Sequence, residues 1–323
     1  MTSLLPALPA VIDRAALPVV IASAGAAASR RFAEFFAAEI RNANTRLAYF
    51  HAARQFLAWA EHVGLALPAI APVHVATYIE QLGQVRSVPT VKQHLAALKH
   101  LFDYLVVGQV VPTNPAAAVR GPAYRVREGK TPILSAEEVR QLFAPFSPAL
   151  LADVRDAAIL SVMVYSFARV SAVVGLTVKD YQRQGARAWL VLDEKGGQHR
   201  KVPVHHVAAD AIETYLERIG STPRNAPLFR SLSHRGTVLT PRPLLRANVF
   251  HMIRRRLAAA GLPEDIGIGC HSFRGTGITN FLEHGGTLET AADIAGHASI
   301  KTTQLYDRRR QQVHQGEIER IRF

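Results

Sequence analysis

The last third of the chain places basic side chains and a tyrosine at short, fixed spacings. His271 and Arg274 are three residues apart, so a helix would carry both on one face. Ala295-Gly296-His297 has the composition of a turn that presents its histidine, and Tyr306 follows nine residues later. Cations that bind a phosphate and a phenol that attacks it can break a phosphodiester bond without a metal ion.

A second arginine lies upstream in Ala168-Arg169-Val170-Ser171, at the end of an apolar helix that should be buried. An arginine there requires an anionic partner, because an unpaired buried charge is very costly. Attack on a phosphodiester builds negative charge on its non-bridging oxygens, and a planar, permanently protonated guanidinium can bind two such oxygens. We expect Arg169 and Arg274 to clamp them; ordinary surface ion pairs are the alternative.

Tyr306 is the candidate nucleophile, and a core tyrosine is the alternative reading. A phenol with a pKa of about 10 attacks poorly at neutral pH, and neighbouring cations would favour its phenolate form. A lysine is expected to protonate the leaving oxygen. Lys195, just before the turn Gly196-Gly197, and Lys201, on the following strand, are the candidates; an exposed hairpin lysine is the alternative.

The histidines and the cysteine are assigned by their context. We expect His271 to position the phosphate or to move the proton of the nucleophile, and His297 to bind the phosphate, although a lone histidine is more often structural. His205-His206 lacks such a context and is interpreted as a loop or N-cap pair. Cys270 is interpreted as a packed thiol.

Several kinds of catalytic site are absent from the sequence. There is no P-loop, no HExxH motif and no CxxC pair, and the Gly-x-Gly at 267–269 lacks the spacing of a dinucleotide fingerprint. No acidic cluster resembles a two-metal nuclease site: Glu137-Glu138 and the pair Asp153 and Asp156 are interpreted as charges on helix surfaces. We therefore expect the protein to use no metal ion and no other cofactor.

In order, these residues form the pattern Arg … Lys … His-x-x-Arg … Gly-His … Tyr, which resembles the signature of tyrosine recombinases, the phage integrase family. The resemblance covers roughly residues 135–310 and extends more weakly to the N-terminal half, which is similar to the family's helical core-binding domain. It implies a 3′-phosphotyrosyl intermediate, a free 5′-hydroxyl and resealing without ATP. It also favours Lys195, because the family places its lysine just before the hairpin turn. One position departs from the family: Ala172 stands where an acidic residue commonly helps to hold the active site.

The charge of the chain favours a nucleic-acid partner. The 323 residues carry a formal net charge of +13. Residues 1–129 hold 12 basic and 7 acidic side chains and the remainder holds 26 and 18, so the excess is +5 and +8 and is not confined to a tail. DNA gripped by both halves fits this distribution, whereas anionic lipid is the other partner that attracts basic surfaces. The single cysteine excludes an intrachain disulfide and fits a reducing cytosol.

The N-terminal half has the pattern of a helical domain. Apolar residues recur at helical spacing over residues 29–60, where Asn44-Thr45 is expected to cap a second helix. Further helices are predicted over Pro72–Leu82 and from Pro89 onward, so residues 29–112 are expected to form an all-helical, SAM-like core-binding domain.

The segments on either side of this domain are predicted to be irregular. Residues 1–28 are expected to be a flexible arm or a frayed first helix, too short for a folded arm-binding domain. Their apolar stretch is too short to span a bilayer and lacks the basic flank of a signal peptide. Residues 113–131, with prolines, glycines and basic residues, are expected to form a linker that lies along the phosphate backbone.

Residues 132–323 are expected to form the catalytic domain and its C-terminal tail. Ser135 and Glu138 have the spacing of a capping box, and an apolar helix, two strands and further helices follow. The helix is predicted over 157–167, and the strands over 188–192 and 199–204, joined by a glycine turn. The fold class is therefore mainly α with a small β-sheet, an α+β catalytic domain joined to a helical domain in a two-domain, C-shaped DNA clamp.

The resemblance implies a bacterial, cytoplasmic site-specific recombinase that acts in the integration, excision or resolution of a mobile element or plasmid. Its expected partners are double-stranded DNA with inverted-repeat core sites and, on synapsed DNA, a homotetramer or an assembly with a related recombinase; no membrane is involved. Because the family commonly docks its C-terminal tail into a neighbouring protomer, the resemblance implies the same for the tail with Ile318, Ile321 and Phe323; the alternative is that it folds back on its own domain. The alternatives are a type IB topoisomerase-like enzyme and a non-catalytic DNA-binding accessory protein.

Overall fold

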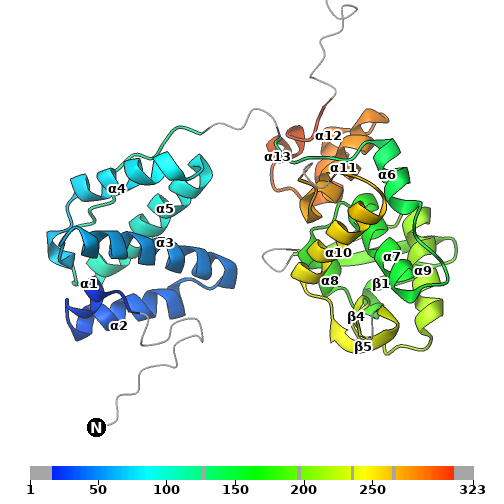
Figure 1. Cartoon of the computed structure of the whole chain (residues 1–323), viewed down its shortest axis with the longest axis horizontal. Coiled ribbons are helices and arrows are strands. Elements are labelled where there is room, and N and C mark those ends of the chain that lie inside the picture. Colours follow the sequence, from blue (N-terminus) through cyan, green and yellow to red (C-terminus); the bar gives the residue numbers. More distant parts are fainter. Residues whose placement is uncertain (1–16, 125–128, 195–197, 234–235, 264–266, 309–323) are drawn as a thin grey trace, which may run out of the picture. The chain divides into compact units, whose positions relative to one another are not determined.

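The computed structural model describes residues 17–124, 129–194, 198–233, 236–263 and 267–308. The chain divides into two compact units, residues 1–125 and 126–323 (Figure 1). Each unit has a hydrophobic core of its own, so each is described by itself below.

The regular elements of the N-terminal unit are all helices in the part that the structure describes. Its helices are α1 (Val19–Ala22), α2 (Ala26–Glu34, continued by a π-helical turn over Phe35–Glu39), α3 (Ala43–His62), a 3₁₀ turn (Leu67–Ala69), α4 (Pro72–Val85) and α5 (Val88–Val107). Phenylalanine rings from α2, α3 and α5 meet in its core, where Phe32, Phe36, Phe56 and Phe102 are fully buried. The predicted helices over 72–82 and from Pro89 onward are confirmed as α4 and α5.

The start of this unit differs from the prediction. Helix α1 lies within the segment that was expected to be an arm, and Val20 and Ile21 belong to the hydrophobic core, so packing begins well before residue 29. The cap of α3 is Asn42 rather than Asn44-Thr45, because the Asn42 side chain accepts hydrogen bonds from the backbone N–H groups of both residues. Residues 1–16 lie outside the described residues.

The predicted linker over 113–131 is shorter than expected. Ala116 and Val119 are buried in the core of the N-terminal unit. At its other end, Gly129 donates a backbone hydrogen bond to the carbonyl of Leu305 at 3.1 Å, within the C-terminal unit. Both ends of the predicted linker are therefore parts of folded units.

In the C-terminal unit, the largely buried helix α7 (Leu151–Tyr165) contacts α9 (His206–Ile219) and α11 (Cys270–Glu283). Its other helices are α6 (Ala136–Phe143), α8 (Val170–Gly175), a 3₁₀ turn (Val178–Asp180), α10 (Arg246–Ala259), α12 (Leu288–Ala295) and α13 (Ile300–Gln304). An antiparallel sheet has the strand order β1 (Tyr181–Gln184), β2 (Arg187–Glu194) and β3 (Gln198–Pro203), and β4 (Arg230–Ser233) pairs with β5 (Val238–Pro243).

Local signals in this half are confirmed where they rest on side-chain chemistry. Ser135 and Glu138 form the capping box of α6, and His205 caps α9 through its ring nitrogen. Strands β2 and β3 lie where they were predicted, whereas β1, β4 and β5 were missed; the turn Gly196-Gly197 lies outside the described residues. The apolar helix ends at Tyr165 rather than at 167, so Arg169 is the N-cap of α8.

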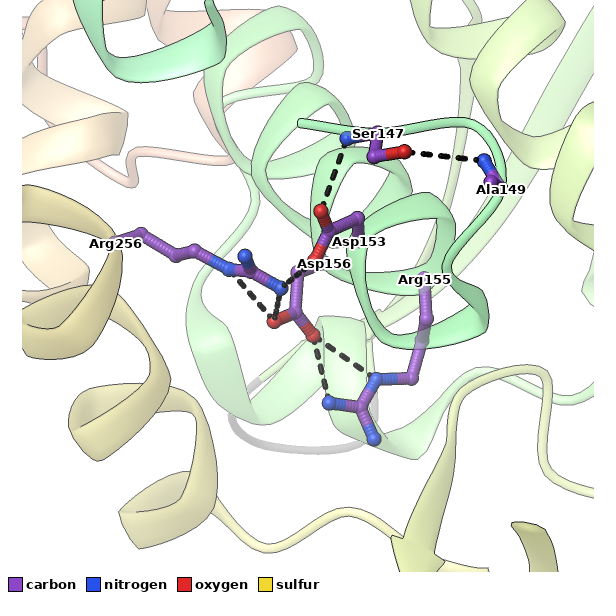
Figure 2. Close-up of polar contacts among 6 residues, drawn as sticks. All are labelled: Ser147, Ala149, Asp153, Arg155, Asp156 and Arg256. Carbon is purple, nitrogen blue, oxygen red and sulfur yellow. Dashed lines mark hydrogen bonds and ion pairs between the residues drawn. The ribbon is translucent and has the colours of Figure 1, made fainter. Parts of the chain in front are cut away.

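Asp153 and Asp156 are not surface charges, contrary to the prediction. Figure 2 shows both carboxylates in a cluster with Arg155 and Arg256. One oxygen of Asp156, which is 1% exposed, accepts from Arg155 Nε and Nη2 at 3.0 and 2.6 Å, and the other accepts from Arg256 Nε and Nη2 at 3.0 and 2.7 Å. Arg256 also pairs with Asp153 at 2.7 Å. The cluster therefore fastens α10 to α7.

The cluster predicts a large loss of stability for Asp156→Asn. The substitution keeps the shape of the side chain but removes the charge that the buried Arg155 and the partly buried Arg256 share, and breaking a buried ion pair costs about 3–5 kcal/mol. Denaturant unfolding followed through Trp189 in a Trp59→Phe background reports on the C-terminal unit, because these are the two tryptophans and Trp189 lies on β2.

The matched control is Glu137→Gln, since the partner pair Glu137–Arg140 is 76% and 69% exposed. Its effect should stay below about 1 kcal/mol. If Asp156→Asn lowered the free energy of unfolding by no more than the control does, the cluster would not stabilise the unit.

Candidate active site

Tyr306 follows α13 and lies in a closely packed position. Its side chain is 6% exposed, its backbone N–H donates to Thr303 O at 2.9 Å, and its carbonyl accepts from Thr279 Oγ1 at 2.9 Å. Gly275 on α11 lets the ring approach the helix, because a Cβ at that residue would lie 3.2 Å from Tyr306 Cε1. The phenol is therefore held against the helix that carries His271 and Arg274.

His271 makes direct contact with the phenol. Its Nε2 lies 2.8 Å from the hydroxyl of Tyr306. Loss of water around the imidazole, together with the charges of Arg274 and Arg169, lowers the pKa of His271. Burial raises the pKa of Tyr306, and the same two arginines oppose that increase. A neutral imidazole beside a phenol can accept the phenolic proton.

Arg274 joins the loops on which the other site residues lie. It is 1% exposed, and its Nη1 and Nη2 donate to the carbonyls of Phe167 and of Ala295, the latter at 2.6 Å. Phe167 adopts a positive φ of 53°, a conformation that is costly for a bulky residue. Phe167 and Ala295 precede Arg169 and His297 by two residues each. The Arg274 side chain therefore holds the backbone next to both of these site residues.

Arg169 and His297 complete the group on this side of the unit. Arg169 is half-buried at the N-cap of α8, and its charge acts on both Tyr306 and His271. His297 follows the left-handed Gly296, as the predicted turn requires, and its Nδ1 lies 2.8 Å from Thr303 Oγ1. The rings of His297 and Tyr306 are nearly parallel at 8°, with centroids 6.1 Å apart. The structure therefore brings together five of the six predicted site residues.

The sixth, Lys195, lies outside the described residues and stays a prediction. Its rival Lys201 is exposed on β3, with Nζ 5.3 Å from the ring centroid of Trp189. Ala172, in place of an acid, is 3% exposed and belongs to the hydrophobic core. Apolar packing rather than a carboxylate therefore anchors α8, the helix whose N-cap is Arg169.

Three residues of the site were missed in the sequence. Thr303 binds the ring of His297. The guanidinium of Arg200, on β3, lies beside the turn before His297, since a Cβ at Gly296 would be 3.0 Å from Arg200 Nε. The carbonyl of Thr131 accepts a hydrogen bond from Arg308 Nη2, two residues beyond Tyr306, at 3.4 Å. Thr303 stands three residues before Tyr306 in the sequence, whereas Arg200 and Thr131 have no motif or spacing that would distinguish them from other polar residues.

The described residues hold no group of three or more His, Cys, Asp or Glu side chains placed to bind a metal ion. Among the described helices, none is both long enough and apolar enough to cross a membrane.

Comparisons with known proteins give matches to two family models and to curated relatives. Residues 132–312 match the family model "Phage integrase family", and residues 30–108 match "Phage integrase, N-terminal SAM-like domain". The tyrosine recombinase XerC of Pelobacter propionicus is 32% identical over 81% of this chain and 84% of its own length. The tyrosine recombinase XerD of Chlorobaculum tepidum is 26% identical over 81% and 85%.

Solved structures show the same fold. The XerH site-specific recombinase in a post-cleavage complex with palindromic difH has a TM-score of 0.66 at 17% identity, over 90% of this chain and 82% of that one. The lambda integrase tetramer bound to a Holliday junction has a TM-score of 0.64 at 17% identity, over 90% and 78%.

Proposed function

The chain belongs to the phage integrase family of tyrosine recombinases, enzymes that cut and rejoin DNA, and we propose that Tyr306 is its nucleophile in site-specific recombination. The observation that carries this assignment is the convergence of Tyr306, His271 and Arg274 on one side of α11, with the phenol 2.8 Å from the imidazole. Arg169 and His297 adjoin the same group.

The proposed reaction follows from the charges around the phenol. His271 takes the phenolic proton as the oxygen of Tyr306 attacks phosphorus, because its lowered pKa keeps the ring neutral. A new phosphorus–oxygen bond forms to the tyrosine, and the bond to the 5′-oxygen breaks. Arg169 and Arg274 stabilise the charge on the non-bridging oxygens, and His297 binds the phosphate. Lys195 protonates the 5′-oxygen, and the reverse steps reseal the strand on a new partner.

The domain assignment and the assembly are also proposals. The match of residues 30–108 to a SAM-like integrase domain supports a core-binding role for residues 29–112, with 132–323 as the catalytic domain. The XerH complex with palindromic difH and the lambda integrase tetramer on a Holliday junction support inverted-repeat sites and a tetramer for this chain. The proposed recombination takes place on DNA in the bacterial cytoplasm, in the integration, excision or resolution of a mobile element or plasmid. The tail over 309–323 lies outside the described residues.

A recombination assay tests this function. Two copies of an inverted repeat taken from DNA that flanks the gene are placed on one supercoiled plasmid, and deletion of the intervening DNA is measured together with the mass of the synaptic complex. Deletion products and four protomers for each pair of sites are expected. Relaxation of a plasmid without sites, and no deletion, would indicate a topoisomerase-like enzyme. DNA binding without strand breakage would indicate an accessory protein.

A further inference from the structure

The turn that carries His297 has a firmly held backbone. Gly296 adopts the left-handed conformation, and the N–H of His297 donates to the carbonyl of Ala292 at 3.0 Å. Just before the turn, the carbonyl of Ala295 accepts from Arg274 Nη2 at 2.6 Å. These bonds fix where the side chain of His297 begins, but the imidazole can still rotate about its own side-chain bonds. Which ring nitrogen faces the site therefore depends on what the ring itself contacts.

The ring of His297 is bonded to the side chain of Thr303 on α13. Its Nδ1 lies 2.8 Å from Thr303 Oγ1, and Thr303 is 0% exposed. The backbone of Thr303 is bonded to the nucleophile's segment as well, because the N–H of Tyr306 donates to the Thr303 carbonyl at 2.9 Å. Thr303 therefore connects the two parallel rings, those of His297 and Tyr306, through bonds of its own.

The direction of the bond between Thr303 and His297 follows from burial. Among the described residues, the imidazole is the one group that the Thr303 hydroxyl contacts. A buried hydroxyl whose hydrogen has no acceptor is costly, whereas donation to Nδ1 satisfies it. An Nδ1 that accepts carries no hydrogen, so the neutral imidazole has its hydrogen on Nε2. The second nitrogen of His297 is thus a donor, which is what a phosphate oxygen requires.

We propose that Thr303 is a positioning residue for His297: its hydroxyl donates to Nδ1, which keeps the hydrogen on Nε2 and lets the neutral ring donate a hydrogen bond to the phosphate. A ring in the other tautomer would present a lone pair to the phosphate oxygens and would repel them. The inference rests on the proposed function, in which His297 binds the phosphate that Tyr306 attacks. Thr303 makes and breaks no covalent bond and acts through the imidazole.

Single-turnover formation of the covalent protein–DNA adduct, on a nicked suicide duplex that carries the recombination site, measures the effect on the reaction. Thr303→Val keeps the branched shape of the side chain and removes the hydroxyl. The adduct should form roughly three- to tenfold more slowly, as for the loss of a neutral hydrogen bond. Thr303→Ser restores the hydroxyl and should return most of the rate. The matched control is Thr302→Val, the same change at the neighbouring, exposed threonine of α13, which should react at the rate of the wild type.

A double-mutant cycle separates an effect through His297 from an effect on packing. If Thr303 acts by directing the ring, Thr303→Val should slow adduct formation no further in a His297→Ala background, because the ring is already gone. Disturbed packing between α13 and the segment of Tyr306 would instead slow the reaction equally in both backgrounds. An equal loss in both backgrounds, or a Thr303→Val variant with the rate of the wild type, would overturn the inference and leave the proposed function intact.

The tautomer of His297 is measured directly by NMR of the full chain with ¹⁵N-labelled histidine, in which the signals of this ring are identified by their absence from His297→Ala. The hydrogen is expected on Nε2 in the wild type, and Thr303→Val should admit the other tautomer. A hydrogen on Nδ1 in the wild type, or an unchanged tautomer in Thr303→Val, would overturn the inference. If the wild type formed no adduct, the proposed function would fail, whereas the NMR signals would still decide whether Thr303 sets the tautomer.

Discussion

Tyr306→Phe is expected to abolish covalent attachment to DNA, with a loss of about 10⁴-fold or more, as when a covalent nucleophile is removed. The substitution deletes one oxygen and leaves the ring that lies against α11 and His297. It removes no positive charge, so the affinity for DNA, which depends on phosphate contacts, should stay within about twofold. The measurement is the yield of adduct on a suicide duplex, with affinity obtained separately by titration.

The matched control is Tyr181→Phe. This phenol also donates a hydrogen bond, to Glu213 Oε1 at 2.6 Å, but it lies on β1 and belongs to no part of the site. Its loss should leave the adduct yield unchanged. Adduct formed by Tyr306→Phe at the rate of the wild type would show that another residue attacks the phosphate. Adduct formation by the wild type should also persist in EDTA, and a strict requirement for Mg²⁺ would contradict the proposed mechanism.

The sequence predicted those elements whose signal is local. Helix α5 carries Leu95, Leu98 and Leu105 on one buried stripe, a period that is visible without any knowledge of partners. The capping box at Ser135 is equally local, because its two hydrogen bonds lie within three residues. Strand β4 was missed because four residues, Arg-Ser-Leu-Ser, are too few to show alternation.

Errors arose where a residue's role depends on a distant partner. Asp156 has the spacing of a solvated helix charge. In the structure it is buried and paired with Arg256, which lies one hundred residues away in the sequence. The same dependence on distant partners explains which site residues could be predicted and which could not. The order of Arg169, His271, Arg274, His297 and Tyr306 could be recognised as a pattern, whereas Arg200 comes to lie beside Gly296 only after the chain has folded.

Arg169→Ala and Arg274→Ala are both expected to slow cleavage by at least about 10²–10³-fold, the usual cost of removing a group that stabilises developing negative charge. Their pH profiles should change as well. Each guanidinium lowers the pKa of Tyr306, so its removal lets that pKa rise further. Each also lowers the pKa of His271, so its removal raises that pKa and leaves more of the imidazole protonated near neutral pH. Both changes move the remaining activity toward higher pH.

The two variants should differ in stability, and the difference shows what the structure adds to the motif. Arg169 is only half-buried, so its loss should cost the C-terminal unit less than about 1 kcal/mol. Arg274 is 1% exposed and donates to the carbonyls of Phe167 and Ala295. Its removal leaves two buried acceptors unsatisfied at about 1–3 kcal/mol each. Denaturant unfolding followed through Trp189 measures both effects.

Arg274→Lys separates the charge from the geometry. A lysine keeps the positive charge near the phosphate but has no planar fork to bind two carbonyls from separate loops. We therefore expect Arg274→Lys to cleave slowly and to lose part of the stability that the alanine variant loses. The bonds of Arg274 to the carbonyls of Phe167 and Ala295 hold the backbone next to Arg169 and His297, and a lysine cannot make both. Wild-type cleavage by Arg274→Lys would mean that charge alone suffices at this position. If Arg274→Ala were as stable as Arg169→Ala, the buried guanidinium would not organise the two loops. Any difference between the cleavage rates of these two alanine variants would then come from their roles in the chemical step.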